Sequence, residues 1–190
     1  MAAGEQVTAA GLLITEYERI KDEQRARIGF RDNLLYATLA SMAAVIAAAL
    51  QGDRRLELLL LLPPVSVVLG WTYLVNDDKI SAIGRYVRDE LRPRLVALTD
   101  GRGDACVFGW EVAHRNDRRR TSRKWLQLAV DLLAFCLAPV AAVVVFWTVG
   151  PVGAPLLAVS LAELVVIAVL GWQIVLYADV KGARVEPPVT

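Results

Sequence analysis

The side chains with the clearest chemical potential are six basic residues that stand close together between positions 115 and 124. An arginine guanidinium carries a permanent charge, and its planar donors match phosphate and carboxylate oxygens. If several subunits surround one axis, such a run forms a positive vestibule that can hold a nucleotide or single-stranded nucleic acid. A simpler interpretation is that the run fixes membrane orientation and touches anionic lipid head groups. The six residues are Arg115, Arg118, Arg119, Arg120, Arg123 and Lys124.

Two carboxylic acids stand inside long apolar runs, Asp131 within residues 125–149 and Glu163 within residues 155–179. An acid at membrane depth is costly to insert and normally faces protein or water rather than lipid. Three roles are open for these acids. They can line a pore in an oligomer, form hydrogen bonds between helices as neutral carboxyls, or serve as sites of proton-coupled transport.

Motifs for enzymatic chemistry are missing from the sequence. It has no phosphate-binding glycine loop, no dinucleotide fingerprint and no nucleophile elbow. His114 is the single histidine, so a histidine metal site or a histidine-based catalytic pair cannot be built. We therefore expect no enzymatic activity, no catalytic residue, no cofactor and no metal site.

Four apolar runs must position these charged groups. The chain has 190 residues, of which 56% are hydrophobic, too large a share for an ordinary soluble domain of this length. A helix needs about 20 apolar residues to cross a bilayer. The sequence predicts an all-α membrane protein with four transmembrane helices arranged as two hairpins. The four runs are residues 33–50, 58–75, 125–149 and 155–179.

The distribution of basic residues predicts the orientation. Of the 21 lysine and arginine residues, 19 lie outside the runs and outside the two short turns that join them. The positive-inside rule therefore places both termini and the central segment in the cytoplasm of a plasma-membrane protein. The predicted segments are a cytoplasmic helix (1–32), a first transmembrane hairpin (33–75), an Arg-rich cytoplasmic segment (76–124), a second transmembrane hairpin (125–179) and a cytoplasmic tail (180–190).

The first cytoplasmic segment predicts an amphipathic helix over residues 11–32, with Leu13, Tyr17, Ile20 and Ile28 at helical spacing. Packing on the protein's own cytoplasmic surface is favoured over binding to the membrane surface.

The central segment predicts a second amphipathic helix. Asn76, Asp77 and Asp78 are expected to cap its start, and Pro93 to kink or divide it. An apolar stripe is expected on one side, and three arginines on the other. The stripe is Ile80, Ile83, Val87, Leu91, Leu95 and Leu98, and the arginines are Arg85, Arg88 and Arg92.

Three stretches carry a resemblance to small integral membrane proteins of actinobacteria: residues 17–24 (YERIKDEQ), 27–36 (RIGFRDNLLY) and 70–81 (GWTYLVNDDKIS). The overall architecture is also similar to the four-helix membrane effectors of bacterial antiphage defence, in particular the nucleotidyltransferase-partnered channel of Hailong-type systems. This second likeness rests on architecture.

The likeness to the defence effectors implies a homo-oligomeric ion channel, with a tetramer favoured, whose opening arrests or kills an infected cell. A DNA oligomer made by the partner nucleotidyltransferase would hold the channel closed. The likeness makes the basic run the candidate ligand contact, the three central-segment arginines secondary contacts, and Asp131 and Glu163 the candidate pore residues.

The leading hypothesis is thus a channel or pore-forming effector gated by an anionic nucleotide or single-stranded DNA. The main alternative is a membrane anchor without conductance, whose cytoplasmic helices bind a partner. A proton-coupled exporter is a third class. Small multidrug transporters also have four helices and an intramembrane glutamate, but they lack a cytoplasmic segment like 76–124, and their glutamate lies in the first helix.

Overall fold

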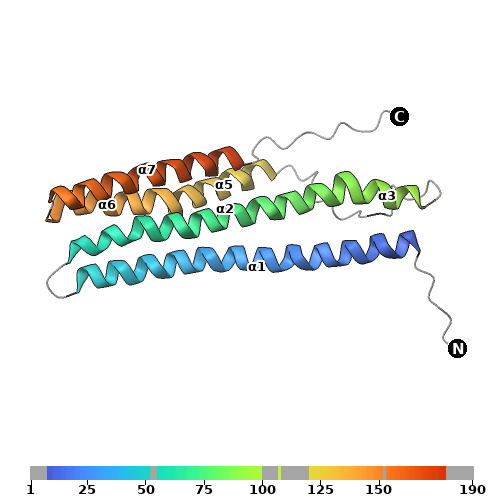
Figure 1. Cartoon of the computed structure of the whole chain (residues 1–190), viewed down its shortest axis with the longest axis horizontal. Helices are drawn as coiled ribbons and strands as arrows, with labels where there is room; N and C mark the ends of the chain where they lie inside the picture. The colour runs from blue at the N-terminus through green and yellow to red at the C-terminus, as the bar shows by residue number, and fades with distance from the viewer. Residues whose placement is uncertain (1–7, 52–54, 100–106, 108–119, 152, 179–190) are drawn as a thin grey trace. The chain divides into compact units, whose positions relative to one another are not determined.

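A computed structural model describes the protein at residues 8–51, 55–99, 107, 120–151 and 153–178. Every regular element in these ranges is helical (Figure 1). Four helical runs are long and apolar enough to cross a membrane, as expected for an all-α, multi-pass membrane protein. The four runs are Ala9–Leu50, Leu56–Ala97, Ser122–Val149 and Ala154–Tyr177.

The first two runs are longer than the apolar segments predicted from the sequence. Helix α1 (Ala9–Leu50) has 42 residues and joins the predicted cytoplasmic helix to the predicted span without a break. No proline occurs in it, and its charged half consists largely of good helix formers such as Glu, Lys, Arg and Gln. Nothing in this sequence interrupts the backbone hydrogen bonds, so the helix continues from its charged half into its apolar half.

The second run begins with a short 3-10 helix, η1 (Leu56–Leu61), which leads into α2 (Leu62–Tyr86). Pro63 and Pro64 stand in the first turn of α2, where a missing N–H breaks no intrahelical hydrogen bond.

Two prolines inside the helical runs are each preceded by a π-helical segment. These segments are η2 (Val87–Leu91) before α3 (Arg92–Ala97), and η3 (Leu133–Leu137) between α5 (Arg120–Leu132) and α6 (Ala138–Val149). The backbone N–H of Arg92 donates to the carbonyl of Val87, and that of Ala138 donates to the carbonyl of Leu133. Both bonds span five residues instead of four.

The position of these wide turns has a physical reason. Proline has no N–H to donate, and its ring clashes with the carbonyl four residues earlier. A wider turn just before the proline moves that carbonyl away. Pro93 therefore does not divide the helix as the sequence analysis allowed. The helical run continues through it as far as Ala97.

The chain's contacts group it into two compact units. Unit 1 is drawn from residues 1–33 and 75–117, and unit 2 from residues 34–74 and 118–190. Helix α1 and the run that contains α2 each contribute to both units.

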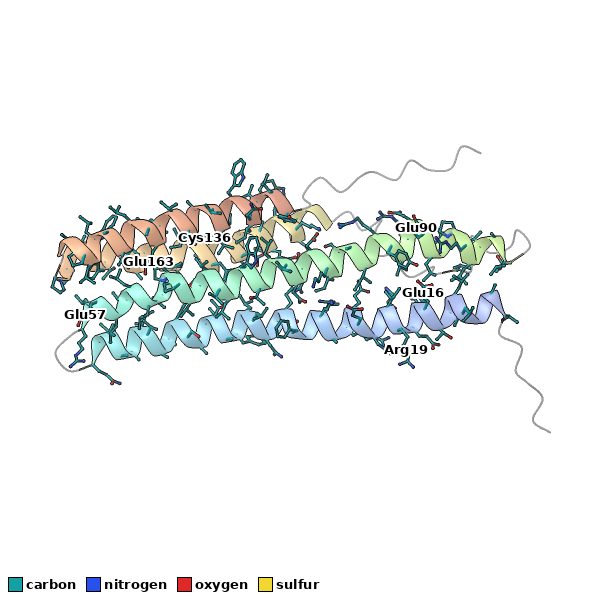
Figure 2. The ribbon with its side chains drawn as sticks, viewed as in Figure 1. Glu16, Arg19, Glu57, Glu90, Cys136 and Glu163 are labelled. Carbon is teal, nitrogen blue, oxygen red and sulfur yellow. The ribbon has the colours of Figure 1, made fainter. Side chains whose placement is uncertain are left out.

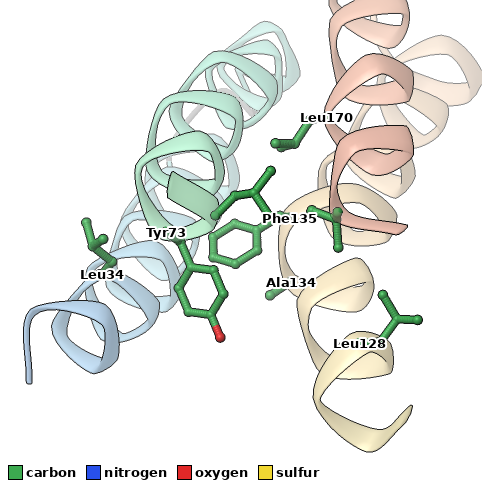
Figure 3. Close-up of a cluster of buried hydrophobic side chains, with 8 residues drawn as sticks. Leu34, Tyr73, Leu128, Ala134, Phe135 and Leu170 are labelled. Atoms are coloured by element: carbon green, nitrogen blue, oxygen red, sulfur yellow. The ribbon is translucent and has the colours of Figure 1, made fainter. Parts of the chain in front are cut away.

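Unit 2 has an apolar core centred on Phe135, whose side chain is fully buried. Its ring lies 5.1 Å from the ring of Tyr73, measured between centroids, and Leu170 packs beside it (Figure 3). Gly70 allows this approach: a Cβ atom built there would lie 2.9 Å from Leu170 Cδ2 and 3.0 Å from two ring carbons of Phe135. The backbone of α2 is thus in direct contact with η3 and with α7 (Ala154–Tyr177).

Two further apolar clusters complete this unit. One contains Met42, Ala49, Leu59, Leu62 and Ala142, and the other contains Leu60, Val143 and Phe146. The protein covers little of the apolar surface of α1 and α7. Only 22% of the residues in the most apolar window of α1, and 17% of those in the corresponding window of α7, are buried. Such surfaces suit contact with lipid or with other subunits.

Unit 1 contains the predicted apolar stripe of the central segment. Val87, Leu91 and Leu95 are buried, whereas Leu98 is 49% exposed. Leu98 follows the last residue of α3, where the helical spacing that would have kept it on the stripe ends.

Candidate functional site

Half of the predicted basic run lies outside the described residues. Arg115, Arg118 and Arg119 belong to that part of the chain, and Arg120 is the first residue of α5. Arg123 and Lys124 stand in the first turns of α5, and both already interact with other groups of the protein. The run as an anion site therefore remains a prediction.

Each of the three secondary arginines has a partner within the protein. Arg85 lies 3.7 Å from the carboxylate of Asp78, and Arg88 donates to the adjacent Asp89. The hydrogen bond from Arg88 lowers the pKa of Asp89 below its ordinary value. The third, Arg92, donates through Nε to the carbonyl of Val107 at 3.3 Å. An anionic ligand would have to compete with these contacts.

Asp131 faces the protein interior. Its side chain is 8% exposed and lies on the same face of the third run as Leu128 and Ala134, which belong to the core around Phe135. One turn earlier, Gln127 donates to the hydroxyl of Tyr73 at 3.4 Å. Its burial agrees with an orientation toward protein, and its role as a pore residue stays a prediction.

Glu163 occupies the corresponding inner face of α7, between the buried residues Ser160 and Ile167. It is labelled in Figure 2. One of its carboxylate oxygens, Oε2, is buried and has no hydrogen-bond partner among the described residues. The hydroxyl of Ser66, a fully buried residue of α2, also has no hydrogen-bond partner among the described residues. By contrast, Ser160 accepts a hydrogen bond of 2.9 Å from the Trp147 indole.

The two acids do not form one site within the chain. Phe135 and Leu170 both contact the position of Gly70, which fixes a common level in unit 2. The contacts also show that the third run and α7 are antiparallel. Leu128, early in the third run, clusters with Ile174, late in α7, whereas Phe146, late in the third run, clusters with Leu156, early in α7.

From this common level the separation of the acids follows. Asp131 precedes Phe135 by four residues and Glu163 precedes Leu170 by seven, so they lie on opposite sides of that level. At a rise of roughly 1.5 Å per residue they are about 16 Å apart along the bundle.

Unit 1 contains a set of polar contacts that were not predicted from the sequence. Asn76, Asp77 and Asp78 do not cap a helix but lie inside α2. Asn76 is 5% exposed and donates to the carbonyl of Arg27 at 2.6 Å, and Asp77 pairs with Arg31 at 2.8 Å.

The signal for these contacts was present in the sequence. Three consecutive polar residues follow directly on an apolar run, and complementary arginines stand just before the preceding run. Two antiparallel helices joined by a short turn would bring these two groups together.

Comparison with protein families, with curated proteins and with solved structures gave no match for this chain. In the part of the chain with described side chains, no group of three or more His, Cys, Asp or Glu residues is placed to hold a metal ion.

Proposed function

We propose that this chain is the subunit of a homo-oligomeric ion channel in the plasma membrane, with two transmembrane hairpins and cytoplasmic termini. An anionic nucleotide or single-stranded DNA, made by a partner nucleotidyltransferase, binds the basic cytoplasmic run and controls opening. A tetramer is favoured, and the cellular role is an effector of antiphage defence.

The observation that carries the proposal is the buried carboxylate oxygen of Glu163, which has no hydrogen-bond partner among the described residues. An unsatisfied buried polar group costs about 1–3 kcal/mol, and the cost is larger for a charged group. A carboxyl in that condition inside a span needs water or a group from another subunit. Assembly around a water-filled path supplies both.

The incomplete cover of the spans supports the same conclusion. Helices α1 and α7 bury little of their apolar windows within one subunit, which leaves room for contacts between subunits. Since the spans carry very few charged groups, Glu163 and Asp131 are the side chains best able to select ions along such a path.

Ion flux through liposomes that contain the purified protein tests the proposal. We expect flux from the wild type and at least a tenfold change in Glu163→Gln, because a neutral amide cannot attract cations as a carboxylate does. Glu57→Gln is the matched control, because Glu57 is an exposed glutamate of η1. Equal flux from the wild type and Glu163→Gln would exclude Glu163 from the pore.

Control by a ligand is tested by measuring the same ion flux with added single-stranded DNA oligomers or cyclic nucleotides. Charge reversal at Arg118, Arg119 and Arg120 is expected to abolish the effect of the ligand while insertion is preserved. Charge reversal at Arg55, an exposed basic residue at the other end of the spans, is the control. An unchanged ligand response in the triple variant would remove the basic run from the mechanism.

The anchor alternative has one observation in its favour: Asp131 is buried against the core of its own subunit, as a packing group would be. It predicts no flux under any condition from verified oligomers. A proton-coupled exporter would instead show substrate transport that depends on a proton gradient and is lost in Glu163→Gln.

A further inference from the structure

The cytoplasmic parts of α1 and α2 are joined by polar contacts. Four interhelical hydrogen bonds form a series that we name the polar seam. They are Tyr86 to Glu16 at 2.5 Å, Gln24 to the Ile80 carbonyl at 3.3 Å, Asn76 to the Arg27 carbonyl at 2.6 Å, and Arg31 to Asp77 at 2.8 Å. All of these residues belong to unit 1.

The seam occupies the face of α1 that packs against α2. Along α1 toward its C-terminal end, half-buried residues recur every three or four positions. This series consists of Leu13, Tyr17, Ile20, Gln24, Arg27 and Arg31. Apolar residues usually fill this spacing where two helices pack together. Here the last three positions are polar, and the helices meet through hydrogen bonds and one ion pair.

Polar groups at such positions fix the register of a helix pair at a cost in stability. Each contact joins groups that also bind water well, so separating the helices exchanges protein hydrogen bonds for bonds to water. The Arg31 and Asp77 side chains are already 24% and 33% exposed, so water reaches them without unfolding. Unit 2, in contrast, is held by three apolar clusters.

We propose that the polar seam is a reversible lock between the cytoplasmic parts of α1 and α2, with the Arg31–Asp77 ion pair as its main contact. If the protein conducts ions as proposed above, on which this part of the inference rests, the lock stabilises one conductance state. Both helices continue from unit 1 into unit 2. Release of the seam therefore frees the cytoplasmic ends of two of the spanning helices.

A distance measurement tests the lock directly. Spin labels are placed at Arg19 of α1 and Ala82 of α2, both exposed, in the full-length protein with its two native cysteines replaced by serine. The wild-type seam is expected to give one narrow distance distribution. In Asp77→Arg, where like charges face each other, we expect a second and longer distance in at least a third of the molecules.

The double variant Arg31→Asp/Asp77→Arg restores an ion pair with reversed polarity and is expected to recover the single distance. Asp78→Asn is the matched control, because the Asp78 carboxylate pairs with Arg85 on the same helix. The control is expected to keep the wild-type distribution. Recovery in the double variant also shows that an arginine at position 77 is compatible with the fold. A single wild-type distance in Asp77→Arg would overturn the lock.

Ion flux from the same variants tests the regulatory part. We expect Asp77→Arg to change flux at least fivefold, and the double variant to return within twofold of the wild type. Unchanged flux in Asp77→Arg, from a conducting wild type, would overturn control by the seam. If the wild type conducts no ions while the distances respond as expected, the proposed function fails and the lock between the helices stands.

Discussion

Replacing Gly70 with alanine adds a methyl group at the point where α2, η3 and α7 meet. The new Cβ would lie 2.9 Å from Leu170 Cδ2 and 3.0 Å from Phe135 Cγ and Cδ1, closer than carbon atoms normally pack. The Phe135 ring cannot move easily, because it is fully buried and packs against Tyr73. Gly70→Ala therefore forces a shift of the ring or of the α2 backbone.

The expected cost follows from these contacts. Extra methyl groups in a well-packed core destabilise by about 1–3 kcal/mol. In an aqueous helix, Ala would recover about 1 kcal/mol relative to Gly through its higher helix propensity. That gain largely cancels for a membrane span, because the spans stay helical when their packing is lost. We expect the free energy of unfolding to fall by about 1–3 kcal/mol in Gly70→Ala.

The assay is unfolding by sodium dodecyl sulfate in mixed micelles, followed by tryptophan fluorescence. Gly29→Ala is the control, because a Cβ at Gly29 meets nothing within 4 Å. Gly171→Ala should have an intermediate effect, since its Cβ would lie 3.3 Å from Cys136 Sγ. Wild-type stability in Gly70→Ala would refute the argument from packing.

A double-mutant cycle identifies the clash. Phe135→Ala removes both ring carbons, Cγ and Cδ1, that the new methyl group would meet, so Gly70→Ala should cost less in that background than in the wild type. The same cost in both backgrounds would show that the effect of Gly70→Ala does not arise from the Phe135 ring.

Two further predictions concern hydrogen bonds, one in unit 1 and one in unit 2. The hydrogen bond from Tyr86 to Glu16 raises the pKa of Tyr86 above its ordinary value of 10.0. Its stabilising effect is thus complete below about pH 10 and is lost as pH rises through the raised pKa. Glu16→Gln should lower this pKa in a tyrosinate absorbance titration, with Tyr86→Phe used to assign the signal. In the spans, Ser160→Ala removes the oxygen that accepts from the Trp147 indole. This substitution should lower the free energy of unfolding by about 1–3 kcal/mol. An unchanged wavelength of maximum Trp147 fluorescence emission in Ser160→Ala would argue against the contact.

The spanning runs could be predicted from the sequence because lipid imposes a minimum length of apolar residues. The helix ends could not. Local preference made Asn76 and Asp77 good capping residues, but their partners are Arg27 and Arg31, far away in the sequence. Contacts between helices overrode the local signal, and no pattern within one segment would have revealed this.

The candidate site residues were also predictable from the sequence only in part. That Asp131 faces protein follows from the cost of a charge in lipid, and its burial beside the core around Phe135 agrees. Its separation from Glu163 depends on how two helices align, which residue spacing in either helix does not contain. The local partners of Arg85 and Arg88 depend on side-chain conformations, which the charge pattern alone did not settle.

The π-helical segments before Pro93 and Pro139 have a consequence for the comparison of related sequences. Each five-residue hydrogen bond accommodates one amino acid more than an α-helical path of the same length. A relative without the proline is therefore expected to be one residue shorter at that point. An alignment that omits this gap would rotate every later position of the helix by about 100°, and would assign lipid-facing residues to the core.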